Sequence, residues 1–129
     1  MSREQIERGL DSLAQAATAS KQLSAQIVTV ASRYAAVLRS GGTLFFCGNG
    51  GSAADAQHVA AEYVVRYSVE RRPFAAVALT TDTSILTAAG NDFAFDQVFA
   101  RQVEALCGPG DLLVLHSSSG QSGNLLAAA

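Results

Sequence analysis

The 129-residue sequence lacks any long uninterrupted apolar run, and none approaches the roughly 20 residues that a membrane-spanning helix needs. It also lacks an excess of basic residues, since 9 Lys and Arg stand against 11 Asp and Glu, for a net charge of −2. We therefore expect no membrane insertion and no general attraction to nucleic acid. The N-terminus has no apolar signal-peptide core, and the sequence has only 2 cysteines. These features predict a cytoplasmic protein with reduced thiols.

The pattern of apolar residues predicts a single α/β domain. Residues 1–40 are expected to form a pair of helices, which opens with a capping box at Ser2 and Gln5 and ends at Gly41 and Gly42. Residues 41–129 alternate short apolar runs with helical patterns. This alternation predicts three parallel strands with helices on both faces of the sheet.

Three apolar runs are expected to be buried strands, because each is short and is bounded by turn residues. In a doubly wound sheet of flavodoxin-like order, ligands bind between the first and third strands, beyond their carboxyl ends. The predicted strands are 43–47, 74–79 and 112–115. The predicted helices after them are 52–67, 93–106 and a last one after Ser122. Residues 83–89 are expected to be a short helix or a turn that Gly90 closes.

Two loops rich in glycine and serine follow the first and third predicted strands. Glycine lets a backbone approach an anion closely, while hydroxyls and the free N–H groups of a helix start donate hydrogen bonds. Both residue types are also ordinary in turns, so one such loop alone would indicate only a turn. Two at neighbouring strand ends favour a phosphate site made of uncharged donors, because neither loop contains Lys or Arg. The candidate hydroxyls are those of Ser52, Ser117, Ser118, Ser119 and Ser122, and Ser52 is also expected to cap its helix.

The first loop has a competing interpretation as a dinucleotide-binding turn. Residues 48–53 match the G-x-G-x-x-A pattern, which expects an acidic residue about 20 positions later, at the end of the second strand. The second predicted strand ends at Leu79, and Asp82 comes too late. A P-loop is excluded because no Gly-Lys-Ser/Thr follows the glycines.

His58 and Glu62 lie one helical turn apart and therefore share a helix face. Together they could bind a divalent metal such as zinc, and Glu62 could serve as a base. From spacing alone, an exposed ladder of His58, Glu62 and Arg66 is the commoner arrangement. The interpretation of these residues as metal ligands or a base is favoured over the ladder because the same helix begins at the proposed phosphate loop.

Other polar residues are open to two interpretations. Asn91 and Asp92 follow Gly90, and they are expected to be either the cap of a helix start or contacts to a ligand. His116 at the end of the third strand is expected to be packed or hydrogen-bonded, and Cys47 is expected to be a core residue.

The sequence resembles the sugar isomerase (SIS) family and, within it, the phosphoheptose isomerases. The resemblance covers nearly the whole chain and rests on three stretches: "CGNGGSAADAQHVAAEYVVRY", "ALTTDTSILTAAGNDFAFDQVFARQVEAL" and "GDLLVLHSSSGQSGN". It implies a single SIS domain over residues 1–129 with a flavodoxin-like fold. It also implies conversion of sedoheptulose 7-phosphate to D-glycero-D-manno-heptose 7-phosphate through an enediol, for bacterial surface glycans.

The resemblance also implies roles for individual residues. Glu62 matches the catalytic glutamate, and His58 with Glu62 match two ligands of a zinc ion bound once per subunit of a homotetramer. The implied substrate contacts are Asn49, Gly50, Gly51, Ser52, Glu62, Asn91, Asp92, Ser117, Ser118, Ser119 and Ser122.

Members of the SIS family continue beyond the position that matches Ala129. The resemblance therefore implies two further strands, a closing helix, and a Gln and a His that would complete the metal site, so the sheet of this chain is expected to be incomplete. A second hypothesis within the family is a non-catalytic module that binds sugar phosphates or a protein partner. Glu62 favours the enzyme, whereas the expected absence of the C-terminal Gln and His favours the module.

Overall fold

A computed structural model describes residues 2–129, and the chain divides into two units, Met1–Arg33 and Tyr34–Ala129. The first unit contains α1 (Arg3–Ala19), the short 3-10 helix η1 (Ser20–Leu23) and the first part of α2 (Ser24–Arg39). The predicted capping box is confirmed, because the Ser2 hydroxyl accepts from the Gln5 N–H while the Gln5 side chain accepts from the Ser2 N–H. No helix among residues 2–129 is both long and apolar enough to cross a bilayer.

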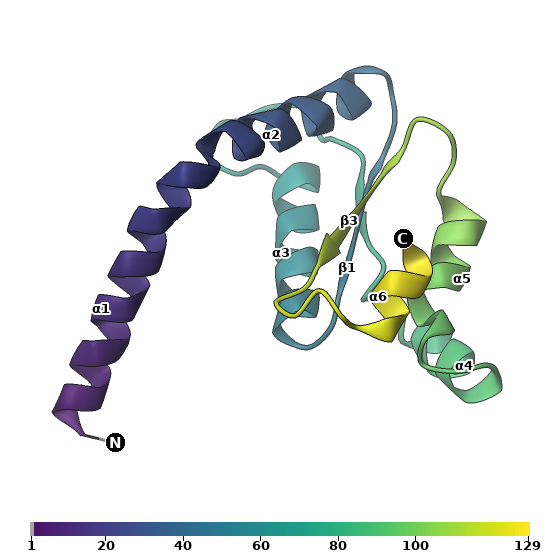
Figure 1. Cartoon of the computed structure of the whole chain (residues 1–129). Coiled ribbons are helices and arrows are strands. Elements are labelled where there is room, and N and C mark those ends of the chain that lie inside the picture. The colour runs from purple at the N-terminus through teal and green to yellow at the C-terminus, as the bar shows by residue number, and fades with distance from the viewer. Residues whose placement is uncertain (1) are drawn as a thin grey trace. The chain divides into compact units, whose positions relative to one another are not determined.

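The second unit is built on a three-stranded parallel sheet, as the sequence predicts. Its strands are β1 (Leu44–Gly48), β2 (Ala76–Ala78) and β3 (Leu112–His116), and their order is β2-β1-β3. One face is covered by α3 (Gly51–Val64), and the other by α4 (Thr83–Asp92), α5 (Gln97–Leu106) and α6 (Gly123–Ala128) (Figure 1). The central position of β1 places the switch in strand order between β1 and β3.

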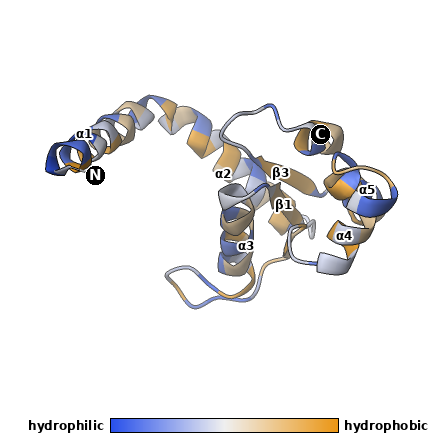
Figure 2. Ribbon diagram, turned by 90° about the horizontal axis from the view of Figure 1, so that it is seen from below, coloured by the Kyte–Doolittle hydropathy of each residue, from blue (hydrophilic) through white to orange (hydrophobic). Residues whose placement is uncertain are grey.

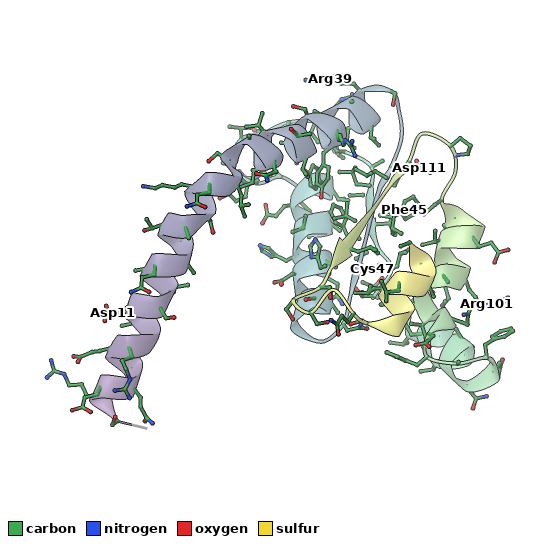
Figure 3. The ribbon with its side chains drawn as sticks, in the orientation of Figure 1. Asp11, Arg39, Phe45, Cys47, Arg101 and Asp111 are labelled. Atoms are coloured by element: carbon green, nitrogen blue, oxygen red, sulfur yellow. The ribbon has the colours of Figure 1, made fainter. Side chains whose placement is uncertain are left out.

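Alternate side chains of β1 pack into two apolar cores, one on each face of the sheet. Leu44 and Phe46 pack against α3 and the end of α2, whereas Phe45 and Cys47 pack against α4, α5 and α6 (Figure 3). Strands β1 and β3 carry hydrophobic colours in Figure 2. Cys47 is a core residue, as predicted, and burial raises the pKa of its thiol to about 11.

Several element boundaries differ from the prediction. Helix α3 ends at Val64 rather than near residue 67, because the Arg71 guanidinium and the Phe74 N–H bond the carbonyl groups of its last turn. Helix α4 continues through Gly90 to Asp92, and α5 begins at Gln97 rather than at residue 93. Strand β2 is three residues long instead of six.

Asp111 ties together the starts of β1 and β3, at the end of the sheet opposite the serine-rich loop (Figure 3). Its carboxylate accepts from the Thr43 N–H at 2.7 Å and from the Gly108 N–H at 2.8 Å. These two hydrogen bonds, led by the one from Gly108, hold the pKa of Asp111 below its ordinary value of 3.8.

The two hydrogen bonds that the Asp111 carboxylate accepts, which we call the Asp111 clamp, predict a specific pH dependence of stability. A carboxyl group with a lowered pKa in the folded state stabilises the fold above its unfolded-state pKa, and this contribution fades as the pH falls through the folded value. We therefore expect the stability gap between wild type and Asp111→Asn to be constant near neutral pH and to shrink below pH 3.8. Urea unfolding at a series of pH values measures this gap. A gap that stays unchanged down to about pH 2 would contradict the clamp.

Candidate functional site

A polar cavity of about 110 Å³, which we call the serine cavity, lies where β1 and β3 end. Both glycine- and serine-rich loops line it. One water needs about 10–15 Å³, so this space admits a group as large as a phosphate. Its lining residues are Asn49, Ser52, His116, Ser117, Ser118, Ser119, Ser122 and Leu125. The predicted meeting of the two loops at the switch point is therefore confirmed.

The first loop contributes Asn49 and Ser52 to the lining of this cavity, whereas the predicted residues Gly50 and Gly51 do not line it. Gly50 adopts a φ of +56°, which side chains rarely allow, and it is the N-cap of α3. Ser52 is not the cap, contrary to the prediction, because the helix begins one residue before it. Its side chain lines the cavity instead. Gly48 permits the tight packing of strand against helix, since a Cβ there would lie 2.6 Å from the Ser52 carbonyl oxygen.

The second loop holds its own serine hydroxyls in place. The Ser117 Oγ accepts from the Gly120 N–H at 2.9 Å, and the Ser119 Oγ accepts from the Gln121 N–H at 3.2 Å. A hydroxyl that accepts one hydrogen bond still has its own hydrogen to donate. The loop therefore positions donors for an anion without any Lys or Arg among the residues that line the cavity.

Three residues of this region were not predicted as site residues: His116, Leu125 and Asn124. His116 lines the cavity, and its ring meets the Phe46 ring edge-on at 5.9 Å, in agreement with the expected packing role. Asn124 is the second residue of α6, is 2% exposed and forms hydrogen bonds with the Asn49 side chain. No short-range sequence signal identifies Asn124, because its partner lies 75 positions away.

His58 and Glu62 project from α3, further from the helix start than Ser52. The His58 Nε2 and the Glu62 Oε1 are 3.5 Å apart, and their side chains are 75% and 31% exposed. Glu62 lines a separate cavity of about 280 Å³ together with Tyr63, Tyr67 and Arg71. The predicted ladder stops at Glu62, since Arg66 lies beyond the end of α3 and no ion pair to it occurs among residues 2–129.

Residues 2–129 supply only some of the ligands that a zinc ion would need. A catalytic zinc ion has three protein ligands, and a structural one has four. Within residues 2–129, no group of three or more His, Cys, Asp and Glu side chains could hold a metal ion. His58 and Glu62 are suitable donors, but one chain does not supply a complete zinc site.

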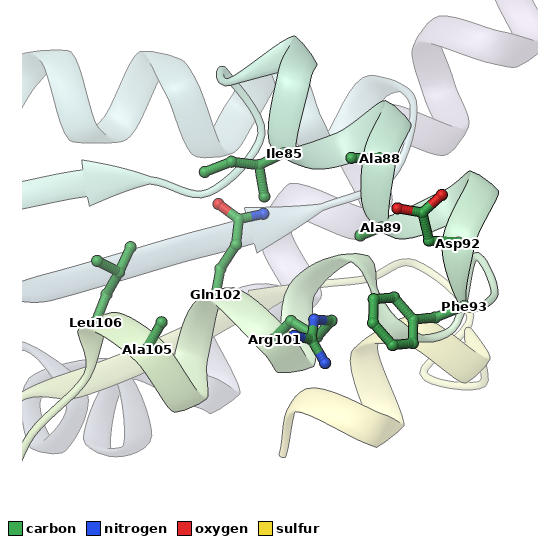
Figure 4. Close-up of a pocket in the computed structure, with 9 residues that line it drawn as sticks. All are labelled: Ile85, Ala88, Ala89, Asp92, Phe93, Arg101, Gln102, Ala105 and Leu106. Atoms are coloured by element: carbon green, nitrogen blue, oxygen red, sulfur yellow. The ribbon is translucent and has the colours of Figure 1, made fainter.

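Asn91 and Asp92 lie at the end of a helix, so their interpretation as a helix-start cap is wrong. Asp82 caps α4 instead, because its carboxylate accepts from the Ile85 N–H at 3.0 Å. The Asn91 side chain donates to the Asp92 carboxylate. Asp92 borders an apolar cavity between α4 and α5, beside Phe93 and Arg101 (Figure 4), and neither residue lines the serine cavity.

Comparison with known proteins agrees with this geometry. The family model described as SIS domain matches residues 10–129. The chain belongs to the SIS domain family. The SIS domain of this chain is 61% identical over 105 residues to the phosphoheptose isomerase of Solidesulfovibrio magneticus, covering 81% of this chain and 52% of that protein. It is 58% identical over 101 residues to the phosphoheptose isomerase of Aquifex aeolicus, covering 78% of this chain and 53% of that protein.

Solved structures share the fold of this SIS domain. A phosphoheptose isomerase from Neisseria gonorrhoeae superimposes with a TM-score of 0.92 at 44% identity, covering 98% of this chain and 66% of that one. One from Francisella tularensis gives a TM-score of 0.92 at 35% identity, covering 99% and 66%. The chain spans about half the length of the curated relatives it matches.

Proposed function

We propose that this SIS domain belongs to a phosphoheptose isomerase, which converts sedoheptulose 7-phosphate to D-glycero-D-manno-heptose 7-phosphate. The observation that carries the proposal is the single cavity formed by the two loops at the ends of β1 and β3. The identity to phosphoheptose isomerases over most of this chain supports the same substrate class. Heptose synthesis for bacterial surface glycans, in the cytoplasm, is the setting we propose.

In this proposal the serine cavity binds the phosphate of the substrate. The hydroxyls of Ser52, Ser117 and Ser119 donate to its oxygens. The Glu62 carboxylate removes one proton from C1 of the ketose while O2 gains a proton, which gives an enediol. A proton is then delivered to C2 while O1 loses its proton, which gives the aldose. Glu62 lies ten residues along α3 from Ser52, about 15 Å at 1.5 Å per residue, so the sugar must extend along that helix or reach Glu62 of another copy.

The proposal is tested by incubating the chain with sedoheptulose 7-phosphate and following formation of the aldose phosphate. Thermal stabilisation by the substrate, measured in parallel, reports binding apart from turnover. Turnover together with stabilisation supports the isomerase. Stabilisation without turnover identifies a sugar-phosphate-binding module, and the absence of both contradicts the phosphate cavity.

We further propose that the assembled protein is a homotetramer with one zinc ion per subunit. Exposed apolar side chains along α1, such as Ile6, Leu10 and Leu13, are consistent with burial against other copies. His58 and Glu62 would be two of the zinc ligands, with the rest from outside this chain, and zinc there can stabilise enediolate oxygens as a Lewis acid.

Native mass spectrometry with added zinc tests both parts of this proposal. We expect the mass of four chains with one zinc ion per chain, and we expect His58→Ala to lose the zinc while the four chains stay together. A metal-free monomer under the same conditions would contradict both parts.

A further inference from the structure

A pair of side-chain amides joins the two loops that line the serine cavity. The Asn49 Nδ2 donates to the Asn124 Oδ1 at 2.8 Å, and the Asn124 Nδ2 donates to the Asn49 Oδ1, also at 2.8 Å. Asn49 lies between β1 and α3, whereas Asn124 lies in α6, immediately after the serine-rich loop. Among residues 2–129 these are the only side-chain hydrogen bonds that connect the two segments.

The two members of the pair differ in burial and in what they can reach. Asn124 is 2% exposed and does not line the cavity, while Asn49 is half-buried and lines it. An amide has two N–H donors, and the reciprocal pair uses one donor of each residue. The second N–H of Asn49 is therefore left for a ligand in the cavity.

The pairing also couples the orientations of the two amides, so that neither can turn alone. If Asn49 rotated by 180° about its last side-chain torsion, its NH₂ would face the Asn124 NH₂ and its oxygen would face the Asn124 oxygen. Both hydrogen bonds would be lost, and one of the groups left without a partner would be buried, which is unfavourable. Asn124 thus fixes the plane of the Asn49 amide and prevents it from turning alone.

We propose that Asn124 is a positioning residue for anion binding: it acts through Asn49, holding an amide N–H toward the phosphate group without touching the ligand. The inference rests on the proposed phosphate cavity. It assigns to Asn124 a role in affinity in addition to its contribution to folding. It also explains why a polar side chain occupies a nearly fully buried position at the start of α6.

A double-mutant cycle tests the proposal, with inorganic phosphate as the probe and titration calorimetry as the measurement. Asn124→Leu fills most of the same volume, and Asn124→Ala is a second variant. We expect either change to weaken phosphate binding by about 10-fold to 100-fold, the effect of losing one hydrogen bond to an anion. In the Asn49→Ala background the same changes are expected to cause no further loss, because Asn124 acts through Asn49.

Gln102→Leu is the matched control. Gln102 is also a buried amide, 5% exposed, but its Nε2 donates to the carbonyl groups of Leu79 and Val98. Its replacement is expected to lower the unfolding midpoint and to leave phosphate affinity unchanged. A purely structural role for Asn124 would produce this same result, or an equal loss in both Asn49 backgrounds, and either outcome would overturn the proposal.

A second measurement uses the wild-type chain alone. In a ¹H–¹⁵N NMR spectrum, added phosphate is expected to shift one side-chain N–H signal of Asn49 strongly and those of Asn124 weakly. Unchanged Asn49 signals at saturating phosphate would overturn the positioning role and leave the phosphate cavity standing. A chain that binds no phosphate at all would overturn the cavity, and the role of Asn124 with it.

Discussion

Glu62→Gln is expected to lower the rate of sedoheptulose 7-phosphate isomerisation by about 10²-fold to 10⁴-fold, which is the usual contribution of a positioned acid or base. Glutamine keeps the size of the side chain but cannot take up a proton from carbon. Glu62 has the accessibility that this role needs, with 31% of its side chain exposed at a cavity. The initial rate of aldose phosphate formation is the measurement.

Glu104→Gln is the control for this experiment, because Glu104 is an exposed carboxylate on α5 outside the cavities that contain Asp92 and Glu62. It is expected to retain the full rate. Substrate-dependent thermal stabilisation should persist in Glu62→Gln, since the phosphate is bound by other residues. Equal rates for wild type and Glu62→Gln would remove Glu62 from the chemistry while leaving the phosphate cavity intact.

Phe46→Ala is expected to reduce the free energy of unfolding by about 3–5 kcal/mol, the usual cost of removing a buried aromatic ring. Phe46 is 0% exposed in the central strand. Its ring stacks on Tyr63 at a centroid distance of 6.0 Å and meets Tyr34 edge-on at 6.3 Å. Because a whole domain is stable by only about 5–15 kcal/mol, this change should leave a substantial unfolded population. Urea unfolding followed by circular dichroism measures the loss.

Phe95→Ala provides the matched comparison, because that phenylalanine is 64% exposed. Its replacement is expected to change stability by less than about 0.5 kcal/mol. If Phe46→Ala reduced the free energy of unfolding as little as Phe95→Ala is expected to, the core on the α3 face would not depend on Phe46.

The sequence predicted those features that local patterns determine. The apolar run ending at Cys47 identified β1, and all five β1 residues are buried, as expected for a central strand. The glycine- and serine-rich loops after β1 and β3 identified the cavity, because parallel strands bring their carboxyl ends to one edge of a sheet. The capping box at Ser2 and Gln5 depends only on neighbouring residues and is also confirmed.

Features that depend on distant partners were predicted poorly. The end of α3 depends on Arg71, which follows the helix and bonds its last carbonyl groups, so helical periodicity alone placed it too late. Asn91 and Asp92 were misplaced because Gly90 was taken as a helix stop, whereas α4 continues through it. The Asn49–Asn124 pair has no local signature, since only the folded sheet brings its members together.

The uncharged lining of the serine cavity has a consequence for how binding would respond to salt. Mobile ions screen charges beyond roughly 10 Å at 0.1 M salt, but they act weakly on donors in direct contact with an anion. No Lys or Arg lines this cavity, so a phosphate there would be attracted by dipoles that act only at short range. Affinity would then vary little with ionic strength, and selection among anions would depend on the fit of their oxygens to fixed N–H and O–H groups.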